Sequence, residues 1–123
     1  MAIYNSFYIG GEWVAPTSGQ TIEVIDPATG LPSGTIGAAD AADVDKAVAA
    51  ARSAFPVFSA SSVEYRLDLL ENILKAYKAR RTDIAEAIRL EMGAPVWLAD
   101  GFQTLLGEIQ FERAIGALKA FAF

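Results

Sequence analysis

The sequence has 123 residues and contains neither cysteine nor histidine. Without cysteine there are no disulfides and no thiolate nucleophiles, and the two absences together exclude the usual zinc sites. The lack of histidine also removes the side chain that most often transfers protons near neutral pH. Ser59, Ser61 and Ser62 therefore have no histidine to activate them as nucleophiles.

Long apolar runs and an excess of basic residues are missing as well. No segment approaches the roughly 18 consecutive apolar residues of a membrane span. The opening residues, "MAIYNSFYIGG", lack the basic region and apolar core of a signal peptide. The net charge of −5 argues against a nucleic-acid partner, which requires a basic surface. We therefore expect a cytoplasmic protein with neither a membrane nor a nucleic acid as its partner.

The residues that are present indicate a globular protein. Hydrophobic residues make up 53% of the chain and charged residues 20%, which excludes a disordered polypeptide. The length corresponds to one domain at most, or to a piece of one. The apolar share is high for a small domain. Two explanations of this high apolar share are compatible with each other: the chain is rich in alanine, and part of its apolar surface is intended for a partner.

The first third of the chain is typical of short strands and turns. Residues 7–9 and 12–14 are β-prone and are joined by Gly10-Gly11, a pair that supplies the positive φ angles of a two-residue hairpin turn. A third strand is predicted at residues 21–25 and a fourth at residues 35–38. The segment between them, residues 26–34, is rich in proline and glycine and predicts a long turn.

Three glycines between the last strands and the first helix allow two interpretations. Gly30, Gly34 and Gly37 occupy the place of a phosphate-binding loop, but they form neither G-x-G-x-x-G nor G-x4-G-K-[ST]. Pro32 also removes one of the backbone N–H groups that such a loop uses. The pattern favours a plain turn over nucleotide binding.

From Asp40 onward the apolar spacing changes to the helical period. Asp40 is the predicted N-cap of a first helix, which we expect to end at Pro56. Asp40, Asp43 and Asp45 cluster at the start of this helix, where they suit the helix dipole or, alternatively, a metal ion.

Three further helices are predicted after the first. Ser61 and Glu64 form a capping-box pattern for the second helix. A third is expected at residues 82–92, with Gly93 as its C-terminal residue. Pro95 is expected in the first turn of a fourth. Gly101, Gly107 and Gly116 lie inside this last helix, where close approach of another backbone would explain them.

The sequence thus predicts an α+β fold that is mostly helical, with short strands followed by about four helices. Residues 1–38 form a strand-and-turn region and residues 39–123 a helical region. The composition supplies no catalytic residue and no cofactor-binding residue. The last helix carries an apolar face through which we expect self-association or binding to a full-length relative. Its residues are Phe102, Leu105, Ile109, Ile115, Leu118 and Phe121.

Five motifs in a fixed order give the chain a family resemblance. They are "YIGGEWV", the run S-G-x-T-x-x-V-x-[DN]-P-A-T-G, "DVDKAVAAARSAF", S-x-x-x-R-x-x-L-L at residues 62–70, and "EMGAP". Together they resemble the amino-terminal region of NAD(P)-dependent aldehyde dehydrogenases. Ala94 stands where a typical member of that family has lysine.

The resemblance implies part of an α/β enzyme with a Rossmann-like coenzyme domain, a catalytic domain and an oligomerisation hairpin. The implied reaction oxidises an aldehyde to a carboxylic acid with NAD or NADP. The cysteine nucleophile, the general-base glutamate and the coenzyme loop belong to later parts of such enzymes, so this chain is expected to be inactive alone. The alternative is a truncated paralogue that acts as a non-enzymatic binding or oligomerisation module.

The resemblance also implies a monovalent cation site. In some members Na⁺ or K⁺ is bound by backbone carbonyls before the [DN]-P turn and by an acidic side chain before the helix-ending glycine. The corresponding residues here are Val24, Ile25 and Glu91. The remaining ligand in the family comes from beyond residue 123. The other interpretation of Glu91 is a solvated helix residue.

Overall fold

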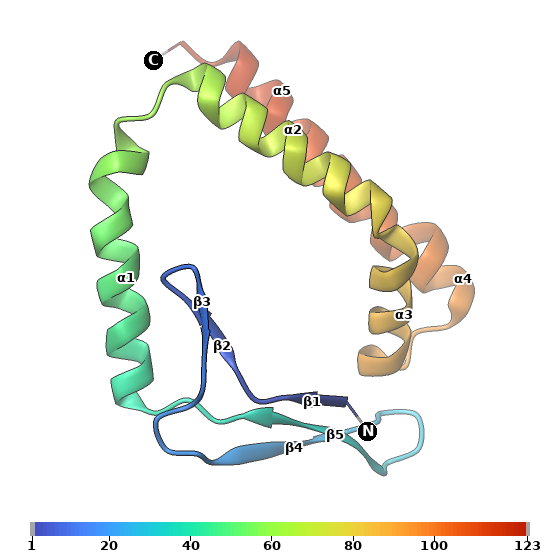
Figure 1. The fold of residues 1–123 in the computed structure, drawn as a ribbon. Helices are drawn as coiled ribbons and strands as arrows, with labels where there is room; N and C mark the ends of the chain where they lie inside the picture. The colour runs from blue at the N-terminus through green and yellow to red at the C-terminus, as the bar shows by residue number, and fades with distance from the viewer. Residues whose placement is uncertain (1, 123) are drawn as a thin grey trace. The chain divides into compact units, whose positions relative to one another are not determined.

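The computed structural model describes residues 2–122, and for residues 2 and 3 it describes the backbone only. The chain is mostly helical, with short strands followed by helices, as the sequence predicts (Figure 1). It divides into two compact units, residues 1–60 and residues 61–123. The boundary between these units lies within the helical region and not at the change from strands to helices near Asp40.

The first unit contains five strands and one helix. The three-stranded sheet has the order β1-β5-β4, with β1 parallel and β4 antiparallel to the central β5. A separate antiparallel hairpin is formed by β2 and β3. The elements are β1 (Ala2–Tyr4), β2 (Phe7–Ile9), β3 (Glu12–Val14), β4 (Thr21–Ile25), β5 (Pro32–Gly37) and α1 (Ala41–Ser59).

The hairpin forms as its sequence predicts, because Gly10 and Gly11 both adopt positive φ angles, 63° and 91°. The predicted strand at residues 21–25 is also confirmed. The expected turn at residues 26–34 is too long, since β5 already begins at Pro32. Asp26 and Leu31 close the actual turn through a backbone hydrogen bond of 2.9 Å, and Gly30 supplies its positive φ of 70°.

The glycine pattern is mainly part of a strand. Gly34 and Gly37 are buried in β5, and a Cβ on Gly37 would lie 2.6 Å from Cγ of Pro16. Gly37 thus allows close packing within the unit, and because both glycines lie in a strand they do not form a phosphate-binding loop. The plain-turn interpretation holds for Gly30 alone.

Helix α1 begins where the sequence predicts but ends later. The Asp40 side chain accepts a hydrogen bond from the Asp43 backbone N–H, and the Asp43 side chain accepts one from the Asp40 backbone N–H, which completes a capping box. The expected end at Pro56 is wrong, because the helix continues to Ser59. Pro56 lacks the N–H that would donate to the Arg52 carbonyl, so the helix continues past it without that hydrogen bond.

The second unit is wholly helical. The helices are α2 (Val63–Ala79), α3 (Arg81–Met92), α4 (Val96–Leu98), the π-helical segment η1 (Ala99–Gln103) and α5 (Thr104–Ala120). Gly93 ends α3 in the left-handed conformation with φ 67°, as predicted.

Two predicted helix starts in this unit need correction. The Ser61–Glu64 capping box is wrong, because the N-cap of α2 is Ser62, whose hydroxyl accepts from Tyr65 N–H at 3.2 Å. The Ser61 hydroxyl instead accepts from Nε of Arg66. Pro95 does not lie in the first turn of the last helical segment but precedes it, with an extended ψ of 146°.

Helices α2 and α5 lie side by side (Figure 1) and run antiparallel, as their ion pairs show. Lys119 pairs with Glu71 at one end, and Lys78 pairs with Glu112 further along, each at 2.8 Å. Between the helices, Ile115 is 8% exposed. The close neighbour of Gly107 is a side chain and not a backbone, since a Cβ there would overlap the Tyr77 hydroxyl. Gly101 and Gly116 face open space in the described part of the chain, so no close approach explains them there.

Burial within each unit is slight. Among the described residues, the hydrophobic side chains less than 9% exposed are Ala85, Ala99 and Ile115, all in the second unit. The accessible surface totals 8820 Å². Even two separate globular domains, each of half this mass, would together expose only about 7,700 Å². The fold therefore leaves more surface uncovered than independent domains of this size do, and many large hydrophobic side chains, such as Trp13, Phe55 and Trp97, are among the exposed residues.

Replacement of the central side chain between α2 and α5 tests this packing. We expect Ile115→Ala to lower the free energy of unfolding of the second unit by about 2–4 kcal/mol, because it removes a buried side chain and leaves a cavity. Urea unfolding followed by circular dichroism measures the change. The control is Ile73→Ala at a position 39% exposed, for which we expect less than about 1 kcal/mol. Equal effects at the two positions would contradict the arrangement.

Candidate functional site

At the start of α1, Asp43 connects the helix to the segment between β3 and β4 within the first unit. We call this set of contacts the Asp43 joint. The Asp43 side chain is 2% exposed, and both of its oxygens lie 3.1 Å from the backbone nitrogen of Thr17, in the connection between β3 and β4. The Thr17 hydroxyl donates to Oδ1 of Asp43 at 2.5 Å. Lys46 adds an ion pair at 3.7 Å and a hydrogen bond from Nζ to Oγ1 of Thr17 at 2.7 Å.

These contacts stabilise the charged form of Asp43. The hydrogen bond from the Thr17 hydroxyl lowers the pKa of Asp43 most, while burial opposes it; the backbone N–H groups of Thr17 and Asp40 and the charge of Lys46 lower it further. The carboxylate is thus engaged by donors from its own chain. Asp40 caps the helix and Asp45 is exposed, so the three residues do not converge as metal ligands. Within the described part of the chain, no group of three or more acidic residues could hold a metal ion.

The predicted apolar face of the last helix is divided between two environments. Ile115 is buried, and Ile109 and Leu118 are half-buried. Phe102, Leu105 and Phe121 are exposed at 54%, 39% and 65%. The structure therefore uses part of the predicted face within the unit and leaves part of it outside, and it does not place the six residues on one continuous surface.

The charged residues of α5 explain which side remains apolar. Glu108, Glu112 and Lys119 form ion pairs with residues of α2 and α3, which leaves Arg113 as the remaining charged residue of α5. Leu106, an apolar residue of this helix outside the six of the predicted face, is 40% exposed beside Leu105. We call the exposed residues Phe102, Leu105 and Leu106 the outer face of the last helical segment. A side with so little charge is suited to contact with other polypeptide.

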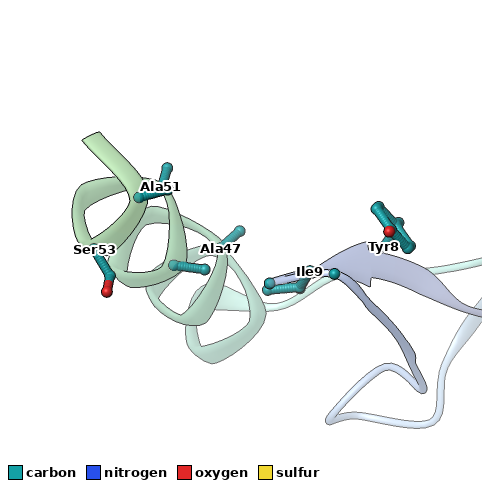
Figure 2. Close-up of a pocket in the computed structure, with 9 residues that line it drawn as sticks. Tyr8, Ile9, Ala47, Ala51 and Ser53 are labelled. Atoms are coloured by element: carbon teal, nitrogen blue, oxygen red, sulfur yellow. The ribbon is translucent and has the colours of Figure 1, made fainter. Parts of the chain in front are cut away.

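A shallow groove of about 590 Å³ lies in the first unit between the hairpin and α1 (Figure 2). Figure 2 shows Tyr8 and Ile9 on the hairpin side and Ala47, Ala51 and Ser53 on α1. The lining is made of small or apolar residues and includes no charged side chain: Tyr8, Ile9, Gly10, Gly11, Ala47, Ala50, Ala51, Ser53 and Ala54. The groove offers packing surface and no group for acid–base chemistry.

The residues of the expected cation site lie in different units. Val24 and Ile25 end β4, and the Val24 carbonyl accepts a hydrogen bond from the Ser33 hydroxyl at 3.1 Å. Glu91 is exposed in the last turn of α3. Oxygen donors of this kind suit a hard monovalent cation.

None of the helices among residues 2–122 is long and apolar enough to cross a membrane.

Comparison with known proteins identifies the family. The model of the aldehyde dehydrogenase family matches residues 13–121. The chain belongs to the aldehyde dehydrogenase family. A Staphylococcus saprophyticus protein named as an aldehyde dehydrogenase is 44% identical over all 123 residues, and one from Staphylococcus haemolyticus is 43% identical.

Solved aldehyde dehydrogenases have the same fold. The enzyme from Bartonella henselae superposes with a TM-score of 0.97 at 37% identity, over all of this chain and 26% of its own. A mutant of aldehyde dehydrogenase C from Pseudomonas syringae, solved with NAD⁺ and octanal, has a TM-score of 0.93 at 39% identity, over 97% of this chain and 24% of its own. The match is to the amino-terminal region of the family, and the chain spans about a quarter (26%) of its curated relatives.

From the contacts of Asp43 we predict how the stability of the first unit of this aldehyde dehydrogenase segment changes at low pH. Because the folded-state pKa of Asp43 lies below its ordinary value of 3.8, its stabilising contribution is present above pH 3.8 and is lost as the pH falls through the folded-state value. We expect Asp43→Asn to destabilise the first unit near neutral pH and to flatten this part of the pH dependence. Thermal unfolding at a series of pH values measures both effects.

The matched control is Asp45→Asn, which removes the same charge at an exposed position two residues away. Its unfolding temperature should follow that of the unmodified chain at every pH. An Asp43→Asn variant that is as stable as the control throughout the series would refute the role of the joint.

Proposed function

We propose that the chain is the amino-terminal segment of an NAD(P)-dependent aldehyde dehydrogenase and acts as a structural layer of that enzyme. The observation that carries the proposal is the superposition on the Bartonella henselae enzyme, which covers all of this chain but only 26% of the other. The uncovered apolar surface supports it, because packing against further polypeptide of the family would bury that surface.

The activity of the whole enzyme then depends on residues outside these 123. The reaction is oxidation of an aldehyde to a carboxylic acid, and its covalent step requires a nucleophile such as cysteine, which this chain lacks. The residues present also do not fit a dinucleotide: Gly34 and Gly37 lie in a strand, and the groove beside α1 has no charged group. NAD or NADP would therefore be held by the later polypeptide, and the segment alone is inactive.

The segment contributes surfaces and, with them, a cation site. The outer face of the last helical segment contacts a full-length relative or the later part of the same enzyme. The assembled enzyme is an oligomer, and it is located in the cytoplasm. Val24, Ile25 and Glu91 provide oxygen ligands for Na⁺ or K⁺, with a further ligand from later polypeptide. The exposed aromatic and aliphatic side chains Phe102, Leu105 and Leu106 also favour a second candidate, a non-enzymatic module that pairs with itself or with a relative.

Complementation distinguishes the two candidates. The Staphylococcus saprophyticus relative, expressed without the region that matches this chain, supplies the remaining three quarters of an enzyme. We expect NAD⁺-dependent oxidation of octanal when both polypeptides are present and none with either alone. Formation of NADH, followed by absorbance, measures the reaction. Activity of the 123-residue chain alone, or its failure to restore activity to the remainder, would disprove the proposal.

A substitution in the outer face tests whether complementation depends on contact through that face. Leu105→Glu places a charge where we expect contact, so complementation should fall at least tenfold, since an unpaired buried charge costs several kcal/mol. Asn72→Glu, which adds the same charge at an exposed position of α2, is the matched control and should lie within about twofold of the unmodified chain. Equal activity of the two variants would show that Leu105 does not lie at the contact. A self-pairing module would associate without restoring activity.

A further inference from the structure

The π-helical segment η1 replaces a backbone hydrogen bond by side-chain hydrogen bonds. In a regular α-helix the N–H of Thr104 would donate to the carbonyl of Asp100. Here it donates to the carbonyl of Ala99, one residue earlier. The Asp100 carbonyl instead accepts from Nη2 of Arg81 and from the Thr104 hydroxyl, both at 2.8 Å. Its hydrogen-bonding requirement is thus met from outside the helical ladder.

Arg81 is fixed by several contacts at once. Its Nε donates to Oγ1 of Thr104 at 3.1 Å, and its Nη1 lies 3.4 Å from Oε1 of Glu108, a side chain only 13% exposed. Thr104 is fully buried, and its own carbonyl accepts a hydrogen bond from the Tyr77 hydroxyl at 3.0 Å. The guanidinium of Arg81 therefore spans the π segment from the first residue of α3. Its planar fork allows it to serve two acceptors simultaneously.

A change from π to α geometry would move the residues that precede α5. The π turn contains one residue more than an α turn, and one residue corresponds to a rotation of about 100° and a rise of about 1.5 Å. Because α5 is held against α2, the shift would fall on Val96–Leu98 and on η1. Trp97 and Phe102, which are 72% and 54% exposed, would then point in different directions relative to Leu105.

We propose that Arg81 is a positioning residue that holds Ala99–Gln103 in the π conformation and thereby sets the direction in which Trp97 and Phe102 meet the polypeptide that covers them. The part about the covering polypeptide rests on the proposed function. The part about helix geometry stands on the contacts of Arg81, Asp100 and Thr104 alone.

The test compares two neighbouring arginines in the full 123-residue chain. Arg81→Met removes the donors to the Asp100 carbonyl and to the Thr104 hydroxyl, whereas Arg80→Met alters a 74%-exposed arginine that pairs with Asp83. Nuclear magnetic resonance couplings across hydrogen bonds identify the carbonyl that accepts from Thr104 N–H. In the unmodified chain and in Arg80→Met we expect Ala99. In Arg81→Met we expect the coupling to move to Asp100, because the α arrangement restores a backbone donor to that carbonyl.

Complementation of the relative's remainder is the second measurement. We expect Arg81→Met to need at least tenfold more chain for half-maximal activity, with Arg80→Met within about twofold of the unmodified chain. Arg81→Lys keeps the charge opposite Glu108 but loses the fork, and it decides the question if Arg81→Met does not fold. We expect it to show the Asp100 coupling or a mixture of both couplings.

The outcomes separate the two proposals. A coupling to Ala99 that persists in every folded Arg81 variant would overturn the positioning role. A coupling that moves while complementation matches Arg80→Met would overturn its consequence for Trp97 and Phe102. If the unmodified chain fails to complement, the proposed function is wrong, and the coupling measurement still decides whether Arg81 sets the helix geometry.

Discussion

The side of α5 that carries the charged residues determines how the helices of the second unit pack and which apolar residues remain exposed. Glu108, Glu112 and Lys119 turn toward α2 and α3, where Glu71, Lys78 and Arg81 meet them. In an ordinary surface helix the charged residues face water and the apolar stripe faces the core. Here they lie along the helix contact, so part of the apolar stripe is left outside. Contact with other polypeptide on that side would bury the exposed apolar residues, and the chain spans only about a quarter (26%) of the length of its relatives.

Local signals in the sequence were sufficient where a short stretch determines its own geometry. Gly10-Gly11 specify the hairpin, Asp40 caps α1 and Gly93 ends α3, because each acts on the backbone within a few residues. Prediction was wrong at two helix boundaries. Pro56 remains within α1, and Ser62 caps α2 while Ser61 accepts a hydrogen bond from Arg66. The π segment could not be predicted, because its stabilising donor, Arg81, is 19 residues from Asp100 in the sequence.

The candidate surface was predictable only in outline. An ideal helical period places Phe102, Leu105 and Ile109 near one stripe, but the inserted π residue alters the phase before Thr104. The sequence also does not state which of two apolar sides packs within the unit. Ile115 packs against α2, and Leu105 and Leu106 remain outside. The family resemblance, by contrast, rests on motifs spread along the chain and does not depend on these details of packing.

The glycine beneath Tyr77 gives the helix pair a second means of alignment. Opposite charges attract at long range, but added salt screens them, and exposed pairs contribute little even in dilute buffer. The space at Gly107 acts through size instead: a Cβ there would overlap the Tyr77 hydroxyl, so the glycine admits the Tyr77 ring, whose centroid lies 5.9 Å from that of Phe111. Steric exclusion is insensitive to ionic strength. The fit of Tyr77 against Gly107 therefore does not weaken when salt screens the ion pairs between α2 and α5.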